Sequence, residues 1–198
     1  KANTSWISPN EEYERALAGF VRGLLARLQP NPFLDDLRAQ AATLSRYGAL
    51  NSIAMTAIKF TSPGVPDLYQ GCELIDLSLV DPDNRRPVDY ALRSRLLDEF
   101  ETAGQDCARY AQSLMADPTD GRAKLWASWR LLALRKRLPA LFAQGNYKAL
   151  AAHGSAAANV LAYRRSHAED TLILVTGRLF AKLLGAGERS PLGVEAWG

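Results

Sequence analysis

The sequence predicts an α+β chain that is mainly helical and ends in antiparallel β-structure. Apolar residues recur at helical spacing through most of residues 9–145, whereas the apolar runs after about residue 146 are short and flank a polar turn. Residues 61–90 are rich in proline and glycine, which rules out a long helix there. We therefore expect a first part, residues 1–116, that contains this segment, and a second part, residues 117–198.

The first expected helix begins near Ser8. The Ser8 hydroxyl and the Glu11 carboxylate can form a capping box at its first turn, and Pro30 ends it. Between these limits an apolar stripe recurs every three or four residues and comprises Tyr13, Leu17, Phe20, Leu24 and Leu28. This spacing predicts an amphipathic helix.

Two more helices are expected before the proline- and glycine-rich segment. Asn31 can cap the first of them, whose apolar face comprises Leu34, Leu37, Ala41 and Leu44. Gly48 interrupts this pattern, because glycine is a poor helix former. We therefore expect a separate helix over about residues 49–60.

Three helices are expected after that segment. Asp89 caps one that runs through Phe100, a second covers about residues 105–115, and Asp120 caps a long one that ends before Pro139. The buried stripe of the long helix is expected to comprise Leu125, Trp129 and Leu132, which Trp126 can join.

The end of the chain has the shorter period of β-strands. Residues 160–163 and 171–176 are expected to pair as strands across the polar turn 166–170. Residues 179–184 fit either a third strand or a short helix. Within the proline- and glycine-rich segment, only residues 65–69 and 77–80 are expected as short buried strands.

Composition and charge narrow the class of function. The chain has 198 residues, of which 47% are hydrophobic and 23% charged, which is typical of a folded protein. Its net charge of +3 comes from Lys and Arg spread along the chain, which argues against a nucleic-acid partner. No stretch approaches the roughly 18 apolar residues of a membrane span, so no membrane partner is expected. No signal peptide is visible either.

The cysteines and histidines give no metal-ligand pattern. Cys72 and Cys107 lie far apart, so we expect reduced thiols and a cytoplasmic location. His153 and His167 have no carboxylate or cysteine at ligand spacing. We therefore predict neither a metal site nor a cofactor.

The candidate site lies in residues 61–90. A loop of this length within a domain is uncommon and tends to be functional. Polar side chains that can hydrogen-bond in fixed geometries follow the first expected strand, and an aromatic ring adds a flat apolar face. Sugars need this mixture, because their hydroxyls bind planar polar groups and their C–H faces stack on aromatic rings. The candidate substrate-binding residues are Asp67, Tyr69, Gln70, Asp83, Asn84, Arg85 and Arg86.

A second interpretation of the same residues is purely structural. Residues 83–86 also fit an ordinary capped turn, in which Arg85 and Arg86 pair with nearby acids such as Asp81 or Asp89. Asp67 and Glu73 are polar groups of the same segment, but nothing in their spacing assigns them a catalytic role.

Several runs carry a family resemblance. S-P-G-V-P-D-L-Y-Q-G-C-E, over residues 62–73, resembles the eighth-strand segment of the α-amylase superfamily, which lies beside the catalytic cleft of a (β/α)₈ barrel. T-S-W-I followed by P-N-E-E-Y-E, K-F-T-S-P-G-V-P-D-L-Y-Q-G and S-L-V-D-P-D-N-R-R-P-V-D-Y are similar to maltooligosyl trehalose synthases in particular. The run L-R-K-R-L-P-A-L-F, over residues 134–142, resembles the helix that follows the barrel. The likeness is strongest over residues 1–90 and weakest after residue 150, and Cys72 stands where the family usually has threonine.

The resemblance implies a fold for each part of the chain. Residues 1–116 would be the end of the catalytic barrel, with helical insertions and a substrate-side loop over residues 61–90. Residues 117–198 would be a linking helix and part of an antiparallel C-terminal β domain. The chain opens at Lys1 and stops at Gly198, and we expect both ends to be cuts within a longer protein.

The resemblance also implies an activity. Family members rearrange the reducing-end α-1,4 linkage of a maltooligosaccharide to α,α-1,1, through a covalent glycosyl-enzyme. The motifs that carry the catalytic carboxylates would lie upstream, and no segment of this chain matches them, so we assign no catalytic residue and expect the isolated chain to be inactive. Expected partners are a maltooligosaccharide and the rest of the barrel. The strand edges and apolar faces of an incomplete barrel also favour a homo-oligomer.

Three other functions fit the sequence. The chain could be a non-catalytic module that binds α-glucan or packs against another domain. It could belong to another hydrolase or transglycosylase of the superfamily. It could also be a helical, weakly basic interaction protein, which salt-dependent binding to nucleic acid would reveal.

Overall fold

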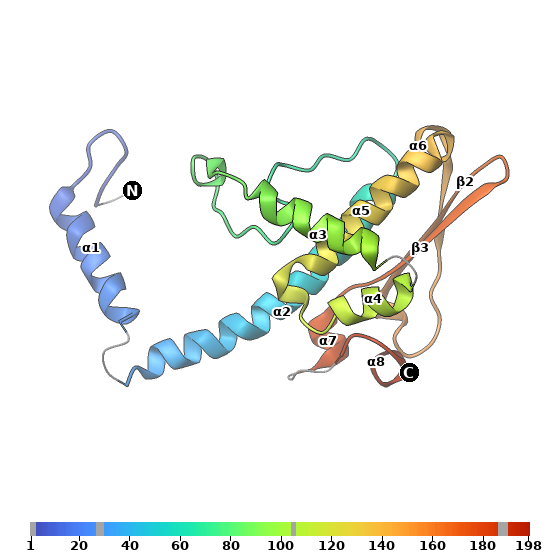
Figure 1. Cartoon of the computed structure of the whole chain (residues 1–198). Coiled ribbons are helices and arrows are strands. Elements are labelled where there is room, and N and C mark those ends of the chain that lie inside the picture. Colours follow the sequence, from blue (N-terminus) through green and yellow to red (C-terminus); the bar gives the residue numbers. More distant parts are fainter. Residues whose placement is uncertain (1–2, 27–29, 104–105, 186–189) are drawn as a thin grey trace. The chain divides into compact units, whose positions relative to one another are not determined.

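The computed structural model describes residues 3–26, 30–103, 106–185 and 190–198. The chain divides into two units, Lys1–Leu44 and Ser45–Gly198, and each is described by itself (Figure 1). The fold is mainly helical with one three-stranded antiparallel sheet, which confirms the predicted α+β class.

Helix α1 spans Glu11–Leu24 and belongs to the first unit. Its N-cap is Asn10, whose Oδ1 accepts a hydrogen bond from the Tyr13 amide at 3.1 Å. The predicted capping box of Ser8 and Glu11 is therefore wrong, because the Asn10 side chain reaches the amides of the first turn and Ser8 instead contacts Ser5. No residue of α1 is buried, and the predicted Leu28 lies outside the described residues.

Helix α2 runs without interruption over Pro32–Thr61. The predicted cap at Asn31 is confirmed, since its Oδ1 accepts from the Leu34 amide at 3.1 Å. The predicted break at Gly48 is wrong. A glycine inside a helix costs only about 1 kcal/mol relative to alanine, and the burial of Ala49 and Leu50 directly after it favours continuing the helix.

In the second unit, α2 is joined by α3 (Tyr90–Thr102), α4 (Cys107–Leu114), α5 (Arg122–Arg137) and α6 (Pro139–Gln144). Asp89 caps α3 as predicted, with its Oδ1 accepting from the Leu92 amide at 2.8 Å. One apolar core joins α3, α4 and α5 and contains Leu74, Leu96, Phe100, Leu114, Ala123, Leu125 and Trp126.

The buried face of α5 differs from the predicted stripe. Leu125 and Trp126 are buried and Trp129 packs against the same core, but Leu132 is 47% exposed. The Trp126 ring meets the Phe100 ring edge-on, with 5.2 Å between their centroids. Because α3 and α4 supply the core around α5, contacts between helices rather than helical spacing select the buried residues.

Helix α5 begins at a close approach between two backbones. Its N-cap is Gly121, at φ +81, and a Cβ there would lie 2.9 Å from the amide nitrogen of Ile75. The predicted cap Asp120 lies one residue earlier, in a short 3₁₀ turn, and its Oδ1 accepts from the Arg122 amide at 2.8 Å. Only glycine combines this left-handed backbone with so close a neighbour.

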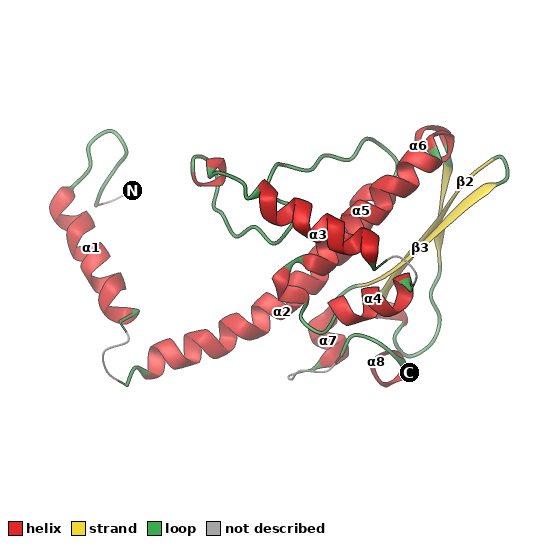
Figure 2. Ribbon diagram, in the orientation of Figure 1, coloured by secondary structure: helices red, strands yellow, loops and turns green. Residues whose placement is uncertain are grey.

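The sheet consists of β1 (Asn146–Leu150), β2 (Val160–His167) and β3 (Asp170–Gly177) in the order β1-β2-β3 (Figure 2). The two predicted strands are confirmed and extend further than predicted. Strand β1 was not predicted, because its sequence N-Y-K-A-L shows no clear alternation. Tyr163 and Leu174 on one face of the sheet pack against Phe142 of α6.

The chain ends in two short helices. Residues 179–184 form α7 (Phe180–Leu184), which is one of the two structures predicted for them, and α8 spans Val194–Trp197. Leu184 packs with Leu50 and Ala54 of α2 in a separate apolar cluster.

The predicted strands at residues 65–69 and 77–80 are absent, and both stretches are irregular. Val65 is 96% exposed and Leu77 84% exposed, so these stretches are not buried either. A strand needs a neighbour for its backbone hydrogen bonds, and no described strand pairs with either stretch. Among the described helices, none is long and apolar enough to cross a membrane.

Candidate functional site

The loop that carries the candidate residues starts at the C-terminal end of α2, where two arginines hold it. Arg135 of α5 donates from Nη1 to the Phe60 carbonyl oxygen at 2.9 Å and from Nη2 to that of Gly64 at 3.2 Å. The last carbonyl groups of a helix lack partners within the helix, and the helix dipole makes this end attractive to cations. The position of Arg135 therefore fixes the direction in which the chain leaves α2.

The second of these arginines is Arg165 of β2, which is only 1% exposed. Its Nη1 lies 3.4 Å from the Thr61 carbonyl oxygen and 3.3 Å from that of Ser62. Its Nη2 donates to the carbonyl oxygens of Phe142, at 3.1 Å, and Gly145, at 3.0 Å. The sheet thus holds the ends of both α2 and α6.

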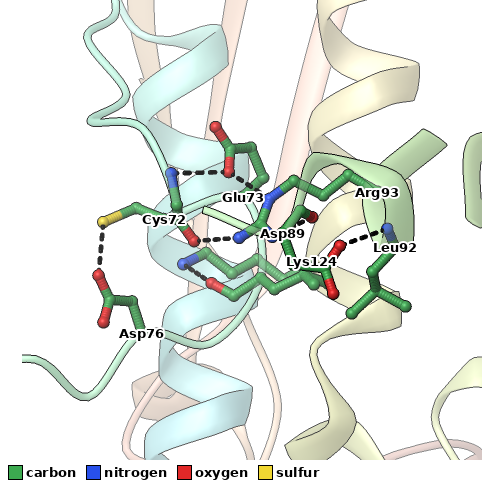
Figure 3. Close-up of polar contacts among 9 residues, drawn as sticks. Cys72, Glu73, Asp76, Asp89, Leu92, Arg93 and Lys124 are labelled. Atoms are coloured by element: carbon green, nitrogen blue, oxygen red, sulfur yellow. Dashed lines mark hydrogen bonds and ion pairs between the residues drawn. The ribbon is translucent and has the colours of Figure 1, made fainter. Parts of the chain in front are cut away.

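Farther along, Arg93 of α3 joins the two arms of the loop (Figure 3). Its Nη2 donates to the Gly71 carbonyl oxygen at 2.6 Å, and its Nη1 to that of Asp89 at 3.0 Å. Its Nε lies 2.8 Å from Oε2 of Glu73, forming an ion pair whose side chains are 13% and 24% exposed. One guanidinium therefore fastens residues 71–73 to the start of α3.

The charge of Glu73 is stabilised in this position. Partial burial alone would raise the pKa of its carboxyl group. Hydrogen bonds from the Arg93 side chain and from the Gly71 amide, at 3.0 Å, outweigh this effect and hold the pKa below its usual value. Glu73 is therefore ionised at neutral pH and acts as an anchor of the loop.

Lys124 of α5 holds the next residue of the loop. Its Nζ donates to the Leu74 carbonyl oxygen at 3.0 Å, and the residue is only 9% exposed (Figure 3). Burial lowers the pKa of Lys124, because the charged ammonium group loses water. Leu74 itself lies in the apolar core, so this hydrogen bond joins the loop to the body of the second unit.

Cys72 is a free thiol. The Cys72 Sγ lies 3.7 Å from Oδ2 of Asp76. Burial and the neighbouring Asp76 carboxylate raise the pKa of the Cys72 thiol. This thiol is therefore a poor nucleophile at neutral pH.

The first candidate residues occupy the arm before Gly71. The Asp67 carbonyl oxygen accepts a hydrogen bond from Lys59 Nζ at 2.9 Å, and the Asp67 side chain is exposed. Tyr69 is 45% exposed, and Gln70 is exposed beside it. The Tyr69 ring is therefore available to stack against a ligand.

The other candidates, Asp83, Asn84, Arg85 and Arg86, form a short 3₁₀ turn and its cap on the second arm. Asp83 Oδ2 accepts from the Leu79 amide at 2.7 Å, and its other carboxylate oxygen pairs with Arg86. These two contacts lower the pKa of Asp83.

The arginines of this turn have acidic neighbours as partners. Arg85 pairs with Asp81, whereas Arg86 pairs with Asp83 rather than with Asp89. These contacts are those of the capped-turn interpretation. Both arginine side chains are about 70% exposed, so their ion pairs are weak and can be exchanged for other partners. The Asn84 Oδ1 atom is buried and accepts no hydrogen bond from the described residues.

The two sets of candidates stay apart in their contacts. Among the described residues, no hydrogen bond or ion pair joins Asp67, Tyr69 or Gln70 to residues 83–86. Within the described part of the chain, no group of three or more metal-ligating side chains occurs either. The exposed side chains of Asp67, Gln70 and Arg85 can form hydrogen bonds with hydroxyl groups.

The residues that hold the loop were not predicted from the sequence; they are Arg93, Lys124, Arg135 and Arg165. For two of these residues, the sequence contains a signal that could have identified them. Arg93 and Lys124 lie near the N-termini of α3 and α5, where the helix dipole disfavours a cation and neither first turn holds an acid. A cation in such a place has a partner elsewhere in the fold.

Comparisons with known proteins agree with this description. A putative maltooligosyl trehalose synthase from Mycobacterium tuberculosis is 37% identical over 174 residues, which are 88% of this chain and 19% of that protein. The structure of maltooligosyltrehalose synthase from Arthrobacter ramosus matches with a TM-score of 0.72 and 33% identity, over 93% of this chain and 22% of that one. A hypothetical maltooligosyl trehalose synthase from Sulfolobus tokodaii matches with a TM-score of 0.67 and 27% identity, over 88% of this chain and 21% of that one.

No family model matches the chain. The chain spans about a fifth of the length of the relatives it matches. The sequence match nevertheless covers 88% of this chain, and the structural match covers 93% of it. Over these residues the chain is a homologue of the maltooligosyl trehalose synthases.

Proposed function

We propose that this chain is the C-terminal part of a maltooligosyl trehalose synthase, which converts the reducing-end α-1,4 linkage of a maltooligosaccharide to α,α-1,1. The observation that carries the proposal is the loop over residues 61–90. It has the family's sequence motifs, and buried arginine and lysine contacts hold it in place while its polar side chains remain exposed.

The proposed role of this loop is to line the substrate site. Asp67, Tyr69 and Gln70 on one arm, and Asp83, Asn84, Arg85 and Arg86 on the other, would contact sugar hydroxyls and ring faces. The exposed ion pairs of Arg85 and Arg86 support this role, because a sugar hydroxyl can replace a weakly held carboxylate. The exposed side chains of Asp67 and Gln70 offer acceptors for hydroxyl groups.

The proposal places the loop at the end of the catalytic barrel, with the rest of the barrel upstream. The exposed apolar side chains of Val65, Leu77, Leu79 and Val80 support this placement. Isolated exposed apolar residues are common, but a cluster of them in one loop favours a neighbouring protein surface. Barrel active sites are lined by the loops that follow the strands.

The proposed chemistry is that of a retaining glycosidase. A carboxylate attacks the anomeric carbon and a second acid protonates the leaving oxygen; the released glucose then turns and attacks through its own anomeric hydroxyl. Water has to be excluded during this turn, or hydrolysis competes. Because this chain has no matching catalytic carboxylate, we propose that it is inactive alone. We also propose that the whole protein works in the cytoplasm.

A chimera tests the proposal. In it, this chain replaces the matching segment of the Mycobacterium tuberculosis relative. We expect the chimera to make a trehalose-ended product from maltopentaose, and the Arg85→Ala variant to turn over more slowly or to release more free glucose. Arg95→Ala, on the exposed face of α3, is the matched control and should leave both the rate and the product ratio unchanged. A folded chimera without product, or an unchanged Arg85→Ala variant, would contradict the proposal.

A second function is favoured by the exposed rings of Tyr69 and Tyr90, which are 45% and 57% exposed. Such rings could bind glucan without catalysis. Calorimetry of this chain with maltopentaose separates the two cases. Millimolar or tighter binding that Tyr69→Ala abolishes favours a binding module, whereas no binding favours a site completed only in the larger enzyme.

A further inference from the structure

Strand β2 carries two side chains that reach the start of the candidate loop. Tyr163 and Arg165 lie two positions apart, so they point to the same face of the sheet, and they are 2% and 1% exposed. Both contact Thr61, which is the last residue of α2 and the first of the loop over residues 61–90. Thr61 is itself only 1% exposed. These contacts are therefore buried within the second unit.

The first contact joins two hydroxyl groups. The Tyr163 Oη atom lies 2.7 Å from Thr61 Oγ1 and 3.3 Å from the Ile58 carbonyl oxygen. Thr61 Oγ1 also lies 2.6 Å from the Ala57 carbonyl oxygen. Buried hydroxyl groups need partners of this kind, because water does not reach them. The pair therefore fixes the last turn of α2 against the sheet.

The second contact is a buried cation held by the ends of two helices. As described above, the Arg165 guanidinium reaches carbonyl oxygens at the C-terminal ends of α2 and α6. Among the described residues no carboxylate forms an ion pair with Arg165, so these carbonyl groups and the negative ends of the helix dipoles stabilise its charge. Lysine lacks the planar fork of donors that reaches several carbonyl groups at once.

The first arm of the loop leads from these contacts to the candidate residues. Pro63 and Pro66 lie between Thr61 and Asp67, and proline fixes the backbone angle φ. The Asp67 carbonyl oxygen is held in turn by a lysine of the last turn of α2, at 2.9 Å. The backbone between these points has little freedom. A shift at Thr61 therefore moves Asp67 and, two residues farther on, Tyr69.

We propose that Tyr163 and Arg165 are positioning residues for the reaction: they set where the first arm of the loop lies against the substrate. This inference rests on the proposed function of the loop. Both side chains are buried, so they act through the arm and not by touching the sugar. An arm that is displaced would hold the released glucose loosely and admit water, so the hydrolysed fraction of the product would rise.

The product ratio of the chimera tests the proposal. Tyr163→Phe removes one hydroxyl group and keeps the ring, and Arg165→Lys keeps a charge without the fork of donors. With maltopentaose, we expect each variant to release about threefold or more free glucose per trehalose-ended product. The assay is run well below the melting temperature of each variant. Tyr163→Phe, the milder change, carries the test if Arg165→Lys does not fold.

Asn159→Ala is the matched control for loss of stability. Asn159 is 6% exposed and precedes β2, and its Nδ2 donates to the carbonyl oxygens of Arg178, at 3.2 Å, and Leu179, at 3.1 Å. It thus also joins a buried polar side chain to backbone carbonyl groups, but away from the loop. We expect a lower melting temperature and an unchanged product ratio, because unfolding removes active molecules without changing what the others produce.

Hydrogen exchange gives a measurement that needs no activity. In Tyr163→Phe and Arg165→Lys, amides of residues 64–71 should exchange faster than in Asn159→Ala, whereas those of residues 83–86 should not. Unchanged exchange over residues 64–71, or a product ratio equal to that of Asn159→Ala, would overturn the proposal. A folded, unsubstituted chimera without product would instead contradict the proposed function, and the exchange result would still decide whether β2 positions the loop.

Discussion

Replacing Arg93 by methionine tests whether one guanidinium holds the candidate site together. Methionine keeps an unbranched apolar stem but loses the ion pair with Glu73 and the hydrogen bonds to the Gly71 and Asp89 carbonyl oxygens. Glu73 then keeps a partly buried charge without its cation. Hydrogen bonds that involve a charged group are each worth about 1.5–3 kcal/mol, and an unpaired charge adds a desolvation cost.

The expected loss for Arg93→Met is about 3 kcal/mol of unfolding free energy, since the Glu73 pair is partly exposed and its loss falls below that of a fully buried pair. Glu73→Gln keeps an oxygen acceptor for Arg93 and should cost less, about 1 kcal/mol. The two changes touch one interaction, so the double variant should lose less than the sum of both.

Urea unfolding followed by circular dichroism measures these differences, with Arg95→Met on the same helix as the control. Hydrogen exchange should also show faster exchange of amides within residues 71–89 in Arg93→Met. A loss below about 0.5 kcal/mol, which is the range of ordinary surface substitutions, would refute the reasoning. Strict additivity with Glu73→Gln would refute it as well.

Three further predictions concern residues around the loop. The pKa of Glu73 is lowered in the folded chain, so its contribution to stability is present above the unfolded-state pKa and is lost as the pH falls through the folded-state pKa. The stability of Glu73→Gln, measured by urea unfolding across this acidic range, should therefore depend less on pH than that of the unsubstituted chain. Gly121→Ala forces an alanine into a left-handed backbone with its Cβ 2.9 Å from the Ile75 amide nitrogen, and should lower the free energy of unfolding by about 1–3 kcal/mol. Gly48→Ala lies inside α2 with no atom within 4 Å of the new Cβ, and should raise the free energy of unfolding by up to about 1 kcal/mol. Thermal melts that rank the two variants in the opposite order would contradict this prediction. Asp76→Asn removes the carboxylate that raises the pKa of Cys72, so iodoacetamide should alkylate Cys72 faster in this variant at pH 8, and an unchanged rate measured by mass spectrometry would exclude Asp76 as a cause.

Local chemistry allowed part of the fold to be predicted. The caps at Asn31 and Asp89 depend on a side chain and an amide three residues later, and both were predicted. The α+β class and the β2–β3 hairpin followed from periodicity and a polar turn. The capping box at Ser8 failed because Asn10, two residues farther on, competes for the same helix start.

The features that could not be predicted depend on contacts between residues that are far apart in the sequence. The break at Gly48 did not occur, since packing of the residues after it keeps α2 continuous. The prediction that Leu132 is buried was wrong, because α3 and α4 supply the residues that pack against α5. The strands expected at residues 65–69 and 77–80 need neighbouring strands that the described chain does not provide.

The sequence by itself determined the class of fold, the helix starts at Asn31 and Asp89, the family resemblance and the segment in which to look for a site. The tertiary structure alone decided how that segment is held. Arg93 reaches Glu73 across 20 residues of sequence, and Arg165 reaches the Thr61 carbonyl across 104. A cap or a periodic stripe depends on residues within a few positions of each other, so sequence shows it. A buried cation satisfied by distant carbonyl groups depends on the packing of the whole unit, and only the folded chain shows its partners.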